Sequence, residues 1–245
     1  MKKTIYFMLA ACLFGFTSCL DENNGDSTHA YAGYFTVGHT DPNGIYTLYM
    51  DGGGIVEPTK SSVYDLTKSE KGLDKYERIY LEFSYKKENV MEGTDANKQN
   101  IVKNADLMYG LVIQTSNIFK TKEEAEVNNV LNPDSIHDVR SFSTWAYRGY
   151  LNLSINGSYG SEKVALPTAS AYCDSIGENF ASIKVLYNRH DSISYGNGNY
   201  LYSFRLKPMF GLVAGSKDSV DIHVTIDGVG TKKTRLPRLD LIPFE

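Results

Sequence analysis

Short runs of alternating apolar and polar residues, each ended by a turn, constrain this sequence more than any other feature. The run Tyr76–Lys87 has apolar side chains at every second position, which is the period of a half-buried strand. The chain contains 18 tyrosines and 21 glycines, a composition that suits sheets with half-exposed aromatic faces and tight turns. The sequence therefore predicts an all-β protein, with one short helix at Lys122–Asn129.

The first group of strands predicts a five-stranded barrel over residues 30–105. The turn Asp41-Pro42-Asn43-Gly44 has a physical basis, because proline presets one backbone angle and glycine permits a positive one. Asp51-Gly52-Gly53-Gly54 then reverses the chain. The expected strands are Ala30–Thr40, Ile45–Asp51, Ile55–Val56, Tyr76–Lys87 and a return strand within Asn100–Lys103 or Leu107–Thr115.

The second group of strands predicts an antiparallel β-sandwich over residues 106–245, because short strands recur there between turn-forming segments. The charged, turn-rich stretch Glu88–Asn100 places the domain boundary near residue 105. The expected turns are Asn156-Gly157, Asn188–Gly198, Gly211–Gly215 and Asp227-Gly228. The expected strands are Trp145–Asn156, Lys163–Leu166, Phe180–Tyr187, Tyr200–Lys207 and Ser219–Ile226.

Residues 1–19 have the layout of a bacterial lipoprotein signal. Two lysines precede the apolar stretch Ile5–Phe16, which at about a dozen residues is too short to span a bilayer core, since roughly 20 are needed. The following Thr17-Ser18-Cys19 resembles the lipobox of bacterial lipoproteins. We therefore expect residues 1–18 to be a cleaved signal peptide and Cys19 to be acylated, so that buried acyl chains attach the protein to a bilayer.

Residues 19–29 are polar and predict a flexible tether. Within them, Leu20-Asp21-Glu22 resembles the acidic export signal of surface lipoproteins in the Bacteroidetes. These features predict an outer-membrane lipoprotein that faces the periplasm or the cell exterior. The alternative is a soluble secreted protein cut near Ser18, in which Cys19 is an ordinary thiol.

Charge and cysteine content narrow the functional classes. The formal net charge of −4 shows no basic excess, so we expect no nucleic-acid partner. Of the 3 cysteines, Cys12 leaves with the signal and Cys19 is acylated, so Cys173 stands alone and no internal disulfide is expected. We interpret Cys173 as a half-buried spectator, the alternative being a nucleophile that no local pattern supports.

Three stretches in this order resemble the NigD-like family of Bacteroidetes lipoproteins. They are Tyr46–Gly54 (YTLYMDGGG), Trp145–Leu153 (WAYRGYLNL) and Leu186–Asp191 (LYNRHD), the last leading to Tyr202-Ser203-Phe204. The resemblance implies an N-terminal OB-type barrel followed by a C-terminal β-sandwich. It implies no settled activity and no catalytic residues, although the family is named from a bacteriocin gene cluster.

The sequence departs from the family pattern after Leu153. The resemblance implies a histidine before the next strand, whereas this chain has Val164-Ala165-Leu166-Pro167 there. A role that depends on that histidine is therefore not expected here.

No residue pattern predicts a metal site, a cofactor or catalysis. None of the 5 histidines stands at metal-ligand spacing from another histidine or a cysteine pair. Arg189-His190-Asp191 is the one local acid–base grouping, and we interpret it as turn hydrogen bonding rather than a catalytic pair. Glu123, Glu124 and Glu126 lack the interleaved Asp and Gly of a calcium loop and are interpreted as a solvated helix face.

Tyrosines near two predicted strands suggest a contact surface. Aromatic rings stack on sugars when they are exposed, but most tyrosines pack with the hydroxyl in water. Both roles remain open for this group, which comprises Tyr147, Tyr150, Tyr195, Tyr200 and Tyr202.

A triplet of Asp, Ser and then an aliphatic residue or Thr recurs in the sequence. Composition alone predicts about one such triplet, so the number found exceeds chance. It resembles the acceptor triplet of O-glycosylation in Bacteroidetes. The alternative is that Asp-Ser begins strands, because both side chains hydrogen-bond turn backbone. We expect sugar on at least one of Ser27, Ser135, Ser175, Ser192 and Ser219.

Together these patterns predict a membrane-anchored, non-catalytic binding or display module of the cell envelope, with an unknown protein or glycan partner. One alternative is a bacteriocin-linked immunity or accessory lipoprotein. A second alternative is a glycan-active enzyme, which requires a cleft with convergent ionisable groups.

Overall fold

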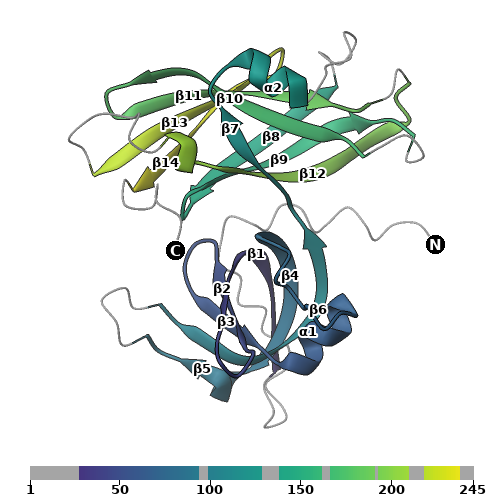
Figure 1. Cartoon of the computed structure of the whole chain (residues 1–245), viewed down its shortest axis with the longest axis vertical. Coiled ribbons are helices and arrows are strands. Elements are labelled where there is room, and N and C mark those ends of the chain that lie inside the picture. The colour runs from purple at the N-terminus through teal and green to yellow at the C-terminus, as the bar shows by residue number, and fades with distance from the viewer. Residues whose placement is uncertain are drawn as a thin grey trace. The chain divides into compact units, whose positions relative to one another are not determined.

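The computed structural model describes residues 28–93, 99–128, 138–161, 166–190, 193–209 and 218–237 (Figure 1). These residues form two compact units. The first unit holds the described residues up to Gly33 together with His39–Lys75 and Leu81–Gly110. The second unit begins at Leu111 and also includes the short segments Tyr34–Gly38 and Tyr76–Tyr80.

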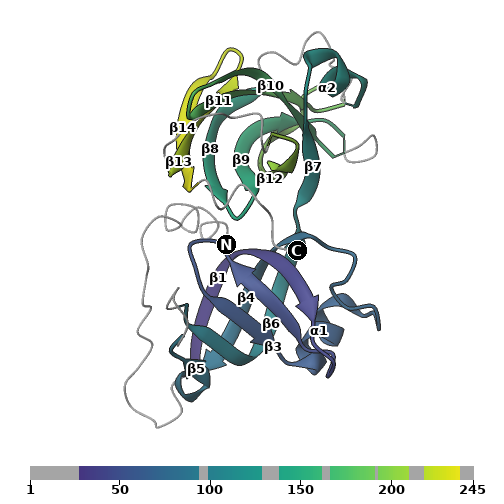
Figure 2. The ribbon, with the colours of Figure 1, turned by 60° about the vertical axis from the view of Figure 1, so that its left-hand side comes forward.

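In the described part of the chain, the first sheet has six strands, and five of them close into a barrel. Its order is β3-β2-β1-β4-β6-β5, and parallel pairing of β3 with β6 closes the ring, as Figure 2 shows. This circular order is that of an OB-type barrel, so the first part of the predicted fold class is confirmed. The elements are β1 (Thr28–Thr40), β2 (Tyr46–Met50), β3 (Ile55–Pro58), α1 (Lys60–Thr67), β4 (Arg78–Lys86), η1 (Lys87–Asn89), β5 (Val90–Met91) and β6 (Ile101–Val112).

Alternation along the strands fills the barrel interior. In β4, Leu81 and Phe83 are buried while the residues between them are half-exposed. The turn after β2 requires glycine, because Gly52, Gly53 and Gly54 all have positive φ angles of 90°, 106° and 109°. The sequence pattern therefore predicted both the strands and the reversal between β2 and β3.

Helix α1 was not predicted, because its residues Lys60–Thr67 are polar and carry no strong helical period. Local capping forms it instead: the Thr59 side chain accepts a hydrogen bond from the Ser62 backbone N–H, and Lys68 ends the helix at φ 49°. The prediction of a single helix was therefore wrong. The predicted helix is confirmed as α2 (Lys122–Asn128).

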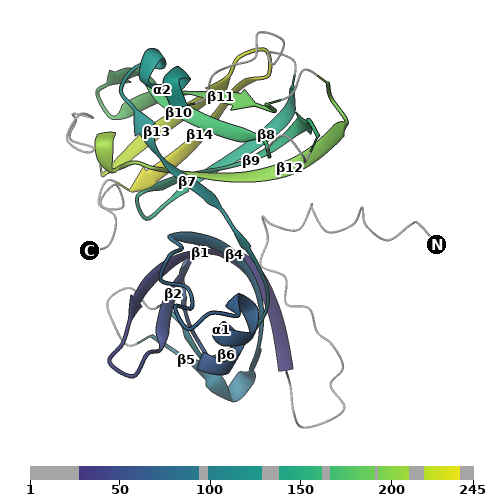
Figure 3. The ribbon, with the colours of Figure 1, turned by 45° about the vertical axis from the view of Figure 1, so that its right-hand side comes forward.

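Eight strands make the second sheet, which folds into a sandwich in the order β14-β13-β11-β10-β7-β12-β9-β8. The prediction of a sandwich is confirmed, but its pairings are not all antiparallel, since β7 pairs in parallel with β10 and β12, and β11 with β13 (Figure 3). The strands are β7 (Gln114–Phe119), β8 (Val139–Tyr147), β9 (Tyr150–Tyr159), β10 (Thr168–Gly177), β11 (Phe180–Asn188), β12 (Gly196–Arg205), β13 (Ser219–Ile226) and β14 (Gly230–Pro237).

Two expectations about strand ends in this unit were wrong. The predicted strand Trp145–Asn156 is a hairpin of β8 and β9, because Arg148 and Gly149 have φ angles of 44° and 82° and turn the chain. The predicted turn at Asn156-Gly157 lies inside β9, where the Tyr187 ring packs so closely that a Cβ on Gly157 would approach it to 2.7 Å.

The remaining differences concern strands without a clear period. β10 and β14 were not predicted, since β10 is built on small residues and β14 on charged ones. Most of the predicted strand Lys163–Leu166 lies outside the described residues. Strand β6 runs through the expected boundary near residue 105, and the two units divide within it, between Gly110 and Leu111.

The second unit has one large apolar core. Alternate residues of β9, β11 and β13 fill it, including Leu151, Leu153 and Ile183 with no exposed area. Among the described residues, no helix is both long and apolar enough to cross a membrane.

Candidate functional site

Two of the predicted contact tyrosines are structural. Tyr150 is 4% exposed and donates a hydrogen bond to Glu77 Oε1 at 2.6 Å, and Tyr202 is 2% exposed and donates to the Pro167 carbonyl at 3.0 Å. Burial raises the pKa of both phenols, which therefore stay protonated. Of the two roles left open for these tyrosines, packing is the one that the positions of Tyr150 and Tyr202 fit, because both side chains are buried.

The other three tyrosines do not share one environment. Tyr195 is exposed at 61%, whereas Tyr200 is half-buried against Tyr187, with ring centroids 6.4 Å apart. Tyr147 is half-buried, and the Arg148 guanidinium lies 5.5 Å from its ring centroid. Only Tyr195 presents most of its ring to solvent.

The LYNRHD stretch builds a buried polar network rather than an acid–base pair. Arg189 forms an ion pair with Asp138, and the Ser158 hydroxyl donates to the same carboxylate at 2.6 Å. The Tyr187 hydroxyl donates to the Ser158 carbonyl at 2.8 Å. These contacts join the end of β11 to β9 and to the residue that precedes β8.

His190 makes two hydrogen-bond contacts, one to β10 and one within its own turn. Its Nε2 lies 2.7 Å from the Thr168 hydroxyl oxygen, and its backbone N–H donates to Asn188 Oδ1 at 2.8 Å. His190 adopts φ 60°, so it occupies a turn position. Asp191 lies outside the described residues, and the Thr168 contact reaches the first residue of β10 rather than a residue of the turn.

The WAYRGYLNL stretch contributes a second polar network, within the second unit. Asn152 Oδ1 accepts hydrogen bonds from Arg78 Nη2 at 2.9 Å and from the Ser203 hydroxyl at 2.8 Å. The Arg78 side chain has no exposed area and also donates to the Thr36 hydroxyl at 2.8 Å. Burial of an arginine costs free energy that hydrogen bonds from its guanidinium offset, so the bonds from Nη1 and Nη2 are part of what holds the fold.

Glu77 and Arg205 form a half-buried ion pair beside this network. Burial by itself raises the pKa of Glu77, but hydrogen bonds from Arg205 and Tyr150 outweigh it and hold the pKa below the ordinary value of 4.5. Glu77 is therefore ionised at neutral pH and serves as a structural anion.

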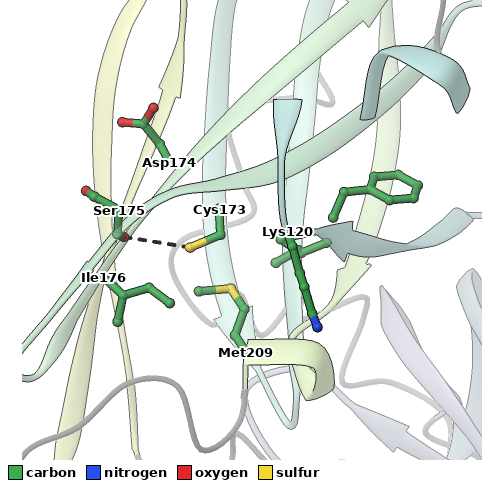
Figure 4. A pocket seen from close by; sticks show the side chains of 8 residues that line it. Lys120, Cys173, Asp174, Ser175, Ile176 and Met209 are labelled. Atoms are coloured by element: carbon green, nitrogen blue, oxygen red, sulfur yellow. Dashed lines mark hydrogen bonds between the residues drawn. The ribbon is translucent and has the colours of Figure 1, made fainter. Parts of the chain in front are cut away.

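An apolar pocket of about 380 Å³ opens beside β10 in the second unit (Figure 4). It lies where β7 ends, where β10 has a bulge between Cys173 and Ser175, and where the η3 turn (Lys207–Met209) follows β12. Ile118 and Met209 are each 3% exposed. Its lining comprises Ile118, Phe119, Lys120, Cys173, Asp174, Ser175, Ile176 and Met209.

The Cys173 thiol is a poor nucleophile in this pocket. Burial, with a smaller effect of the Asp174 carboxylate, raises its pKa above the ordinary value of 9.0. Its Sγ lies 3.7 Å from the Ser175 carbonyl oxygen, and no histidine lines the pocket. The sequence correctly predicted a half-buried cysteine, but nothing local indicated the pocket around it.

The acidic face of α2 is engaged in ordinary surface contacts. Glu124 Oε2 accepts a hydrogen bond from the Lys120 backbone N–H at 3.0 Å, and Glu126 pairs with Lys122 at 3.3 Å. Among the described residues, no group of three or more histidine, cysteine, aspartate or glutamate side chains gathers as metal ligands do.

The predicted modification sites are only partly within the described residues. Ser175 is exposed in the β10 bulge, and Ser219 is the first residue of β13 and half-buried. The remaining predicted sites, Cys19, Ser27, Ser135 and Ser192, lie outside the described residues.

The fold defines the class of protein as one with an OB-type barrel and a β-sandwich. In this protein the LYNRHD and WAYRGYLNL stretches form buried hydrogen-bond and ion-pair networks that hold the fold. No known protein family and no curated protein matches the sequence. Solved structures of Bacteroidetes proteins do resemble the fold. A protein of unknown function (DUF1344) from Bacteroides vulgatus is 14% identical with a TM-score of 0.53, and the match covers 85% of this chain and 90% of that one.

Two further structures are similar over comparable lengths. A putative toxin-related protein from Parabacteroides distasonis is 17% identical, with a TM-score of 0.48 and coverage of 84% and 92%. A NigD-like immunity protein from Bacteroides caccae is 15% identical, with a TM-score of 0.47 and coverage of 83% and 90%. The structural neighbours thus include a NigD-like protein, and none of the three names states a catalytic activity. At these identities the likeness concerns the fold alone.

Proposed function

We propose that this protein is a lipid-anchored protein of the outer membrane that binds a small apolar ligand without transforming it. The observation that carries the proposal is the pocket beside Cys173. Its volume of about 380 Å³ lies within the range of small-molecule sites, and its floor of Ile118 and Met209 is apolar. An apolar floor favours binding of hydrocarbon through removal of its surface from water.

The distribution of ionisable groups supports binding over catalysis. Enzymes gather titratable groups with perturbed pKa values in a cleft. Here Arg189 and Asp138 pair with each other, as do Arg205 and Glu77, and none of the four lines the pocket. The Cys173 thiol has a raised pKa, which opposes formation of a thiolate.

The N-terminal sequence supports the anchoring part of the proposal. The lipobox-like Thr17-Ser18-Cys19 is followed by a polar stretch that leads to β1 at Thr28. A tether of this length, roughly 3.3–3.6 Å per residue when extended, permits the folded part to lie near the membrane surface that holds the acyl chains.

Reactivity of the pocket thiol tests the binding part. In the mature chain carrying Cys19→Ser, Cys173 is the sole remaining cysteine, so its alkylation by iodoacetamide reports on the pocket. We expect octanol, an uncharged apolar probe, to slow alkylation in a saturable way and to be recovered unchanged by mass spectrometry.

Two matched variants locate the effect. Ile176 lines the pocket and is 37% exposed, whereas Ile193 is 59% exposed and does not line it. Ile176→Asp should weaken protection by octanol, and Ile193→Asp should leave it unchanged. Alkylation that is insensitive to octanol, or conversion of the probe to a product, would contradict the proposal.

A further inference from the structure

Within the described ranges, the pocket carries one cation with no ion-pair partner. Lys120 follows the last residue of β7 and lines the pocket, and its ammonium has no carboxylate within salt-bridge distance in the part of the chain that the structure describes. Its backbone is fixed, because its N–H donates to Glu124 Oε2 at 3.0 Å. The side chain is therefore anchored at its base and free to pair at its tip.

The other charge on the pocket is already balanced. Asp174 pairs with Lys184, with 3.5 Å between Oδ1 and Nζ. In Figure 4 the Asp174 carboxylate points away from Cys173, whereas the Lys120 Nζ lies on the side of the pocket where Met209 lies. The field that a ligand meets over the apolar floor is therefore that of the Lys120 ammonium.

An apolar floor beside a single ammonium is complementary to an apolar molecule with one negative group. Ile118, Met209 and Ile176 offer a surface for hydrocarbon. Lysine is a compact point charge without the flat fork of arginine, so it suits a single carboxylate and gains little from a planar bidentate partner. A neutral apolar molecule would gain nothing from this exposed ammonium, and a cationic one would be repelled by it.

We propose that the pocket beside Cys173 binds a small apolar carboxylate, such as a fatty acid of medium chain length, with its hydrocarbon on Ile118 and Met209 and its carboxylate on Lys120. The proposal rests on the binding function proposed above and adds the chemical class of the ligand. Charge complementarity sets the preference for the carboxylate, and the apolar floor supplies the binding common to all apolar probes.

The test compares two probes of equal chain length on the same protein. Octanoate and octanol are titrated against alkylation of Cys173 in the mature Cys19→Ser chain, at about pH 8.5 so that part of the thiol is ionised. We expect octanoate to protect Cys173 at a concentration about two- to fivefold lower than octanol, the range that an exposed ion pair provides. The preference should shrink in high salt, because screening weakens exposed charge pairs.

Two lysine variants serve as the test and its control. Lys120→Gln should abolish the preference for octanoate while leaving protection by octanol intact. Lys122→Gln removes a lysine two positions on that pairs with Glu126 and does not line the pocket, so it should change neither probe. Fluorescence of the sole tryptophan, Trp145, verifies that both variants are folded.

The outcomes separate this inference from the proposed function. Equal protection by octanol and octanoate would overturn the carboxylate preference and leave the binding function standing. A preference for octanoate that persists in Lys120→Gln would overturn the role of Lys120 and also leave the binding function standing. Protection by neither probe would overturn both. Stronger protection by the peptide Gly-Gly-Leu with a free C-terminus than by octanoate would overturn the assignment to a small-molecule carboxylate.

Discussion

Removal of the Asp138 carboxylate should destabilise the second unit far more than removal of a matched surface carboxylate. The Arg189 and Asp138 side chains are 9% and 4% exposed, and Oδ2 of Asp138 is buried with no hydrogen-bond partner among the described residues. Asp138→Ala removes the carboxylate that forms an ion pair with the buried Arg189 guanidinium. Loss of one partner of a buried pair costs about 3–5 kcal/mol of unfolding free energy.

Arg235 and Asp221 provide the control, since they are the same two residue types on the surface of the same unit. Their side chains are 69% and 43% exposed, with 2.7 Å between Nε and Oδ1. An exposed pair contributes about 0–1 kcal/mol, because water and salt screen it. Asp221→Ala should therefore change the free energy of unfolding by about 1 kcal/mol or less.

Urea unfolding of the mature chain, followed by Trp145 fluorescence, measures both variants. Trp145 lies in β8 and reports on the second unit. With a slope of about 1–3 kcal/mol per molar urea, Asp138→Ala should lower the midpoint by at least about 1 M. The double variant Asp138→Leu/Arg189→Met should lose less than the sum of the single losses, because it removes both charges of the pair together. Equal losses for Asp138→Ala and Asp221→Ala would refute the buried-pair reasoning.

Four further predictions follow from the sequence and the fold. The lowered pKa of Glu77 gives stability that is present above pH 4.5 and is lost as pH falls through the lower folded-state value. In urea titrations at several pH values, acid should therefore lower the free energy of unfolding more in the native chain than in the Glu77→Gln variant. Cys19→Ala should abolish incorporation of a radioactive fatty acid, and continued labelling would contradict lipidation. Limited proteolysis should release a stable fragment of about 100–140 residues from the part of the chain after Leu111, where the second unit is continuous; a ladder without such a fragment would count against separable domains. The intact mass of protein from its native host should exceed that of the lipidated polypeptide because of O-linked sugar on at least one of Ser27, Ser135, Ser175, Ser192 and Ser219.

The fold was predictable wherever burial of one strand face imposes a period of two. β4 and β13 were predicted because their buried residues alternate, as Val220, Ile222 and Val224 do. β10 was not predicted, since small residues form its buried side: Ala169 and Ala171 are buried in the core, and the Ser170 hydroxyl donates to the Ala125 carbonyl of α2. Alanine and serine produce little hydrophobic contrast in a sequence, so a strand that contains them becomes recognisable only from the neighbours that pack against it.

The pocket was not predictable, because residues far apart in the chain build it. Ile118, Cys173 and Met209 come from β7, β10 and η3, and no local pattern joins them. In the sequence Arg189 groups with its neighbours His190 and Asp191, whereas in the structure it pairs with Asp138, which precedes β8 and is separated from Arg189 along the chain by strands β8 to β11. Long-range charge pairing depends on strand order, which the sequence alone did not define.

Strand β7 sets an order of events for folding. Among the described residues, Gln114–Phe119 pair with two strands that come later in the chain: Ile118 with Ala171 of β10, and Gln114 with Tyr202 of β12. The chain is synthesised from the N-terminus, so one side of β7 awaits its partner until β10 has been made, and the other side until β12 has been made. Pairing over such separations costs loop-closure entropy before contacts offset it, which slows folding. The second unit therefore matures late, and until then the nascent chain presents an open strand edge, the kind of surface that invites aggregation or capture by a chaperone.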